Sequence, residues 1–145
     1  MRSLFSSWQL WAVLSAAFAA LTAIFAKVGV ENVGSDFATF IRTIVILCAA
    51  GAILVLTGQW QPLGSVSARS YAFLVLSGLA TGGSWLCYFR ALKLGDAARV
   101  APIDKLSVVL VAIFGAVFLG EKLAAQNWLG VALIALGAIL VAFKV

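Results

Sequence analysis

The chain has 145 residues, of which 64% are apolar, and it carries 10 basic and 5 acidic side chains. Soluble domains are about 45–50% apolar and about 25% charged, so a chain that is only 10% charged cannot cover a water-facing surface. Disordered chains are poor in apolar residues, so disorder is excluded as well. The composition therefore predicts an integral membrane protein that is all-α.

The residue inventory also limits the chemistry. The chain has no His, and its two cysteines, Cys48 and Cys87, are far apart and lie in apolar runs. Zinc-site spacings and the Ser–His and Cys–His nucleophile pairs are therefore missing. No phosphate-binding G-x-x-x-x-G-K-[ST] loop is present, so ATP is not expected to bind. Although the net charge is +5, the basic residues are scattered singly, which argues against nucleic acid as a partner. We expect neither enzymatic activity nor a cofactor.

Five apolar runs each approach the roughly 20 residues that cross a bilayer core of about 30 Å. Barrel strands are excluded because the runs are too long and lack period-two alternation. We therefore predict a bundle of five transmembrane helices in a single domain covering residues 1–145. Asp36 is expected to cap the start of the second helix. The predicted spans, in chain order, are residues 8–27, 37–57, 71–92, 100–119 and 124–143.

An alternative interpretation of the N-terminus is a cleaved signal peptide, because Arg2 precedes an apolar run with small residues near its end. The uncharged stretch is longer than the roughly 7–15 residues of a signal peptide's apolar region. We favour a retained helix, and the intact mass of the purified protein distinguishes the two possibilities.

The basic residues predict an orientation, since cytoplasmic loops carry an excess of Lys and Arg. With five spans, three basic residues fall on the side of the N-terminus: Arg2, Arg69 and Lys122. Seven fall on the other side: Lys27, Arg42, Arg90, Lys93, Arg99, Lys105 and Lys144. We expect the N-terminus outside and the C-terminus in the cytoplasm.

Three charged residues fall inside predicted spans, where a charge costs roughly 2.5–3.5 kcal/mol on insertion scales. Arg42 lies in the second span, and Asp104 and Lys105 lie in the fourth. Lys105 has a stem long enough to reach the headgroups, so snorkelling competes with a functional role. Asp104 is too short to do so; we expect it to face the interior, pair with Arg42, or bind a cation or proton.

Pro102 precedes Asp104 by two residues. If the fourth helix begins near residue 100, proline lies in the first turn, where it is tolerated. If the helix begins near Asp96, proline breaks it beside the charges, and interrupted helices near ionisable groups are where transporters bind substrates. Trp85 and Tyr88 lie within the third span, either as lipid-facing bulk or as the wall of a cavity.

Small residues recur at a spacing of four, which allows helices to approach closely. They serve either packing within one bundle or contact with a second subunit. These residues are Ala12, Ala16 and Ala20, Gly78 and Gly82, Ala112, Ala116 and Gly120, and Ala138 and Ala142.

An ordered string of motifs then resembles a known family. Its parts are Ala91-Leu-Lys-Leu-Gly95, Ala97-Ala-Arg-Val-Ala-Pro102, Gly120-Glu121-Lys122-Leu123, Trp128-Leu-Gly130 and Ile134-Ala-Leu-Gly137. With Phe25-Ala-Lys27 and Phe40-Ile-Arg42, the chain resembles the EamA-type domain of the drug/metabolite transporter superfamily over about residues 10–145.

The resemblance implies a fold that is half of a ten-helix inverted-repeat transporter, since many relatives carry two such domains. A chain with one domain then implies a homodimer, or a heterodimer with a related five-helix protein. Carried over by position, Arg42 and the segment from Pro102 to Lys105 match regions that line or support the pathway. Glu121 and Lys122 match a turn motif with a structural role.

Together these observations predict a transporter of the bacterial-type cytoplasmic (inner) membrane, an exporter or permease for a small metabolite or amphipathic solute. It would work as a secondary active dimer, with the lipid bilayer and a small-molecule substrate as partners. The expected substrate or coupling-ion pathway comprises Arg42, Trp85, Tyr88, Pro102, Asp104 and Lys105. The alternative is a non-transporting membrane subunit or scaffold of a larger complex.

Overall fold

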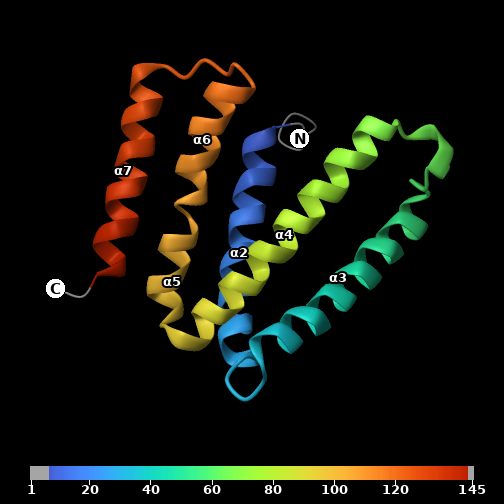
Figure 1. Ribbon diagram of the computed structural model, residues 1–145, viewed down its shortest axis with the longest axis horizontal. Coiled ribbons are helices and arrows are strands. Elements are labelled where there is room, and N and C mark those ends of the chain that lie inside the picture. The colour runs from blue at the N-terminus through green and yellow to red at the C-terminus, as the bar shows by residue number, and fades with distance from the viewer. Residues whose placement is uncertain (1–6, 144–145) are drawn as a thin grey trace. The chain divides into compact units, whose positions relative to one another are not determined.

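The computed structural model describes residues 7–143, which form helices and no strand (Figure 1). The α-helices are α2 (Trp8–Gly29), α3 (Ser35–Thr57), α4 (Ala68–Leu94), α5 (Ala97–Asp104), α6 (Ser107–Phe118) and α7 (Ala125–Ala142), with a 3₁₀ turn η1 (Leu63–Ser65) before α4. Five segments are long and apolar enough to cross a membrane when α5 and α6 are taken together. The predicted five-helix membrane fold is confirmed. Two residues used for the orientation, Arg2 and Lys144, lie outside the described residues.

Two glycines end helices by adopting the left-handed conformation that residues with a Cβ disfavour. Gly58 follows α3 with a φ of 64°, and the Gln59 N–H donates to the Leu54 carbonyl at 3.2 Å. This is the Schellman arrangement, which satisfies carbonyls that the helix leaves unpaired. Gly120 follows α6 with a φ of 70°. Both helices therefore end abruptly at the glycine that follows them.

The fourth span is not a continuous helix. It begins at Ala97, after Asp96 as the N-cap, so Pro102 lies beyond the first turn. Proline has no N–H, and the carbonyl of Ala98 therefore loses its helical donor. The Leu106 N–H turns to the Ile103 carbonyl at 3.0 Å, a three-residue spacing in place of the helical four. Of the two predicted starts for this helix, the earlier one is confirmed, and with it a break beside the charges.

The described helices group into two compact units. The first contains α2, α5, α6 and α7, and α7 packs against both α5 and α6. Arg99 at the start of α5 ties this unit together, donating from Nε and Nη2 to the carbonyl of Ala142 at 3.2 and 2.9 Å. Lys27 at the end of α2 donates to the Gly95 carbonyl at 2.8 Å. Both cations thus satisfy carbonyls near segment ends.

The second unit is the helical hairpin of α3 and α4, residues 28–93. At one end of the hairpin, the Lys93 ammonium donates to the Val33 carbonyl at 2.9 Å. In the connection between the helices, the Tyr71 hydroxyl donates to the Leu63 carbonyl at 2.7 Å. The most buried residues of the hairpin are Val30, Thr39, Phe89 and Leu92. The single domain predicted for residues 1–145 stays a prediction.

Most large apolar side chains in the described residues are exposed. Phe18 of α2, Leu47 of α3 and Phe73 of α4 are 68%, 71% and 63% exposed. Apolar surface of this kind is compatible with lipid tails, which are as apolar as the side chains themselves. Helix association in such an environment depends on close packing and polar contacts.

Candidate pathway residues

The guanidinium of Arg42 lies over aromatic rings of the neighbouring helix. Its Cζ atom is 4.2 Å from the centroid of the Trp85 ring and 5.3 Å from that of Phe89. Trp85 and Phe89 are four residues apart on α4 and therefore share one face of the helix. A cation over an aromatic face gains about 0.5–1 kcal/mol when exposed and about 2 when desolvated. Arg42 and Trp85 are half-buried, and Phe89 is 3% exposed.

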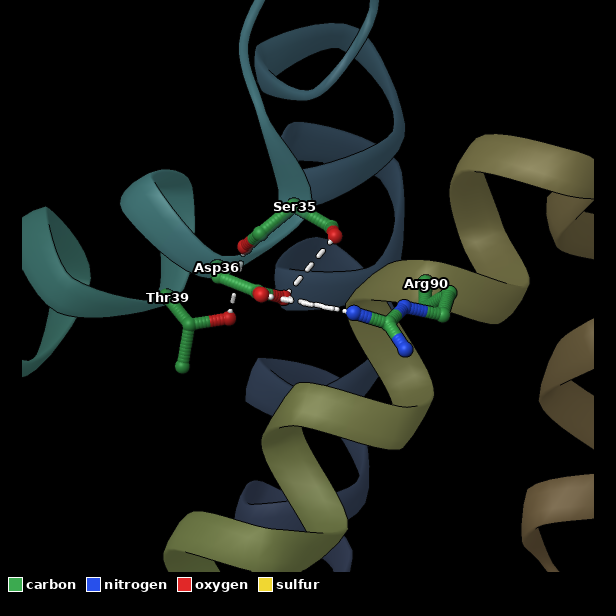
Figure 2. Close-up of polar contacts among 4 residues, drawn as sticks. All are labelled: Ser35, Asp36, Thr39 and Arg90. Atoms are coloured by element: carbon green, nitrogen blue, oxygen red, sulfur yellow. Dashed lines mark hydrogen bonds and ion pairs between the residues drawn. The ribbon is translucent and has the colours of Figure 1, made fainter.

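A second polar cluster joins the start of α3 to the end of α4 (Figure 2). Arg90 donates from Nη2 to Asp36 at 3.3 Å, and the Ser35 hydroxyl donates to the same carboxylate at 3.1 Å. The Thr39 hydroxyl donates to the Ser35 carbonyl at 2.9 Å. Because Arg90 and Asp36 are 66% and 62% exposed, the pair contributes at most about 1 kcal/mol in water.

This cluster corrects the expected role of Asp36. The N-cap of α3 is Gly34, and Asp36 lies inside the first helical turn, because the helix begins two residues earlier than predicted. A carboxylate there still interacts favourably with the helix N-terminus. Its partner Arg90 was missed at the sequence level. The sequence did contain a signal for the pair. Asp36 is an acid at the start of one predicted span and Arg90 is a base at the end of the next, and antiparallel helices bring these two ends together.

Arg42 lies six residues beyond Asp36, which is about 9 Å further along the helix axis. The hairpin therefore carries an exposed ion pair at its end and a stacked arginine deeper in the span. Tyr88 is half-buried and lies between Trp85 and Phe89 in the sequence of α4. Of the predicted pathway residues in this unit, Arg42 of α3 contacts Trp85 of α4. Tyr88 lies on α4, three residues after Trp85.

Asp104, Lys105 and Pro102 lie together at the break between α5 and α6. Asp104 is the last residue of α5, and Lys105 is its C-cap. The Lys105 ammonium is 3.6 Å from Asp104 Oδ2, and the two side chains are 54% and 34% exposed. This separation and exposure make a weak ion pair, so Asp104 is not held as tightly as a buried partner would hold it. The predicted pair of Arg42 with Asp104 stays a prediction.

The turn motif lies at the end of α6. The backbone N–H of Glu121 donates to the Gly115 carbonyl at 3.0 Å. The Glu121 carboxylate lies over buried Gly115, where an added Cβ would stand 2.6 Å from Oε2. Lys122 is exposed. Both contacts of Glu121 join the turn to the last part of α6, and the structural role expected for Glu121 and Lys122 stays a prediction.

Metal ions have no clustered ligands here. Within residues 7–143, no group of three or more His, Cys, Asp or Glu side chains is placed to hold an ion. Cys48 and Cys87 are free and exposed.

Five apolar spans, one of them broken beside charged side chains, define an α-helical multi-pass membrane protein. The chain matches the EamA-like transporter family over residues 6–143 and belongs to that family, which confirms the resemblance. It is 71% identical over 136 residues to a Sinorhizobium protein described as an uncharacterized transporter in the cobO 3′ region, with 94% of this chain and 96% of that protein covered. No solved structure matches. Both similarities support a membrane transporter and point away from an enzyme.

The predicted contact between Arg42 and Asp104 has a direct thermodynamic test. In a double-mutant cycle with R42Q and D104N, a direct pair gives a coupling of about 1 kcal/mol or more in the free energy of unfolding in detergent. The cycle that replaces R42Q with R69Q serves as the control. Arg69 lies at the exposed start of α4, so its effect should add to that of D104N within about 0.5 kcal/mol. Additivity in both cycles would contradict the pair.

Proposed function

We propose that the protein is a secondary active transporter of a small metabolite or amphipathic solute in a bacterial-type cytoplasmic membrane. The observation that carries the proposal is the break between α5 and α6 with Asp104 beside it. Backbone that departs from the helix is tolerated at membrane depth only where protein or a water-filled cavity covers it. Transporters place substrate and ion sites at such discontinuous helices.

Asp104 is the group we assign to ion or proton coupling. It lies within the fourth span, and its contact with Lys105 is long and partly exposed. A carboxylate held this loosely remains able to exchange a proton or to accept a cation. The break also provides motion, because the two shorter helices can tilt against each other where the four-residue hydrogen bonds are interrupted. Pro102 and Lys105 support the site in this proposal, the first by breaking the helix and the second by its charge.

The role of Asp104 predicts a specific loss of transport. Liposomes containing only this protein would receive a panel of isotope-labelled amino acids, organic acids and sugars under an imposed pH gradient. We expect gradient-driven movement of at least one compound, reduced about tenfold or more by D104N and retained by D104E. The measurement is the label on each side of the membrane after filtration.

Asp96 provides a matched control for this experiment. It is an exposed acid eight residues earlier, caps α5 without a side-chain hydrogen bond, and lies at the helix end. D96N should therefore leave the flux unchanged. Equal flux for the wild-type protein and D104N would remove the coupling role. If the wild-type protein moves none of the compounds, the non-transporting subunit becomes the better interpretation.

We further propose that the transporter works as a dimer. A single five-helix unit is thin for a pathway with two gates, and the resemblance implies ten helices for the complete machine. Gly78 and Gly82 of α4 supply a contact face, since neither has a neighbouring atom within 4 Å of an added Cβ. These two glycines therefore leave room for a second helix to approach closely.

Closing this gap should disrupt the dimer without disturbing the subunit. Replacing both Gly78 and Gly82 with Leu should raise the dimer dissociation constant in detergent by about tenfold, which is about 1.4 kcal/mol. G83L is the control, because Gly83 is equally open but points about 100° away around α4. Light scattering across a dilution series measures the equilibrium. An unchanged constant for the double variant would exclude this face.

The orientation is proposed from the distribution of basic residues, with the C-terminus in the cytoplasm. Lys27, Arg90, Lys93 and Arg99 all lie at helix ends adjoining two connections that share this side. A fluorescent reporter fused to the C-terminus should light up, and the same reporter at the N-terminus should stay dark. Equal signals from both fusions would indicate mixed orientations and contradict the assignment.

A further inference from the structure

We infer that the guanidinium of Arg42 binds an oxyanion, the carboxylate or phosphate of the transported solute. The inference rests on the proposed transport function and names the chemical class of its substrate. It is drawn entirely from the hairpin of α3 and α4, residues 28–93.

The hairpin has fewer acidic than basic side chains. Its two acidic residues are Glu31 and Asp36, and Asp36 is occupied by Arg90. Within residues 28–93, Arg42 forms neither an ion pair nor a hydrogen bond; its guanidinium lies over the rings of Trp85 and Phe89 and interacts electrostatically with Tyr88. An arginine this far inside a span carries a substantial insertion cost, which stacking offsets in part. A bound anion would offset the rest of this insertion cost by neutralising the charge of Arg42.

The Cζ atom of Arg42 lies over the Trp85 ring, 4.2 Å from its centroid. The N–H groups of this guanidinium have no hydrogen-bond acceptor from the hairpin. Among the described residues, every fully buried side-chain nitrogen has a hydrogen-bond partner. The Arg42 nitrogens have no such partner, so they are not fully buried and remain accessible. The planar fork of N–H donors matches the two oxygens of a carboxylate or phosphate. Contact with the two rings also restrains the guanidinium before the anion arrives, which lowers the ordering cost of binding.

The surface next to the Arg42 cation is aromatic. Trp85 and Phe89 place aromatic rings next to the proposed anion position, so the site suits an anion with an apolar body. A small, strongly hydrated inorganic ion gains nothing from these rings and pays more to leave water. The proposed ligand is therefore an organic oxyanion, which agrees with an amphipathic solute.

The hairpin contains two other arginines for comparison. Arg90 already has its carboxylate, Asp36. Arg69 lies over the Phe73 ring at 5.9 Å and occupies the exposed start of α4, where water solvates it. Arg42 alone among these three combines a close stack, a position well inside a span and no counterion within the hairpin. Arg69 therefore serves as a matched control.

The fluorescence of Trp85 can report binding because the Trp85 ring contacts the Arg42 guanidinium, the group proposed to bind the anion. We would replace Trp8, Trp11, Trp60 and Trp128 with Phe in the full chain, so that emission comes from Trp85 alone. The purified protein in detergent would be titrated with benzoate, phenyl phosphate and inorganic phosphate. A saturable change in emission with benzoate or phenyl phosphate is expected, and the stronger of the two identifies the headgroup. Saturation by inorganic phosphate at equal or lower concentration would contradict an organic ligand.

Variants then assign the response to Arg42. R42Q should abolish saturation, and R42K should weaken it about tenfold because an ammonium lacks the planar fork. R69Q should leave the titration unchanged. Equal weakening by R69Q would reveal general charge attraction and overturn the inference, as would an unchanged titration with R42Q. Benzyl alcohol, a neutral analogue, controls for partition into detergent, and an identical response to it would also overturn the site.

The internal carboxylate provides the remaining alternative. If Asp104 permanently neutralises Arg42, the wild-type protein will show no anion response and D104N will acquire one, which overturns the inference in favour of the ion pair. The outcome is separable from that of the proposed function. Arg42-dependent binding without flux supports the site and contradicts transport, whereas flux with anion binding that ignores Arg42 contradicts only the site.

Discussion

The cost of a charged side chain inside an apolar span constrains this protein more than any other interaction. Arg42 meets that cost through the faces of Trp85 and Phe89, at 4.2 and 5.3 Å. This contact stabilises the cation without neutralising it, so the charge is retained. The hairpin consequently carries a cation without a carboxylate partner of its own unit, and the proposed oxyanion site rests on this charge.

The fourth span complements this arrangement with a different departure from regular structure. Pro102 removes a backbone donor, the following bonds tighten to a three-residue spacing, and Asp104 and Lys105 occupy the junction. A continuous helix would be more stable in lipid, because every backbone group would be paired. Such an interruption therefore marks a place where local stability is exchanged for polar groups and motion.

The sequence alone predicted the five spans because long apolar runs leave few alternatives. It located Arg42, Asp104 and Lys105 because charges are conspicuous there. The start of the fourth helix was harder, since Ala97 to Val100 favours helix without fixing where it begins, and the break depends on that start. The contacts of Phe89 with Arg42 and of Arg90 with Asp36 could not be predicted from the sequence. Which residues of α4 face α3 depends on how the two helices pack. Small residues predict close approach but do not identify the partner.

Three of the cations that favour one orientation in the membrane also hold the backbone together. Lys27 bonds the Gly95 carbonyl, Lys93 that of Val33, and Arg99 that of Ala142. An antiparallel form of the proposed dimer would need a second copy inserted upside down, and the simplest route is to remove basic residues from these helix ends. In this chain that route would also loosen the joints between helices. A reversed orientation therefore requires new hydrogen-bond donors to these carbonyls as well as a new distribution of basic residues. Folding and membrane orientation would have to change together.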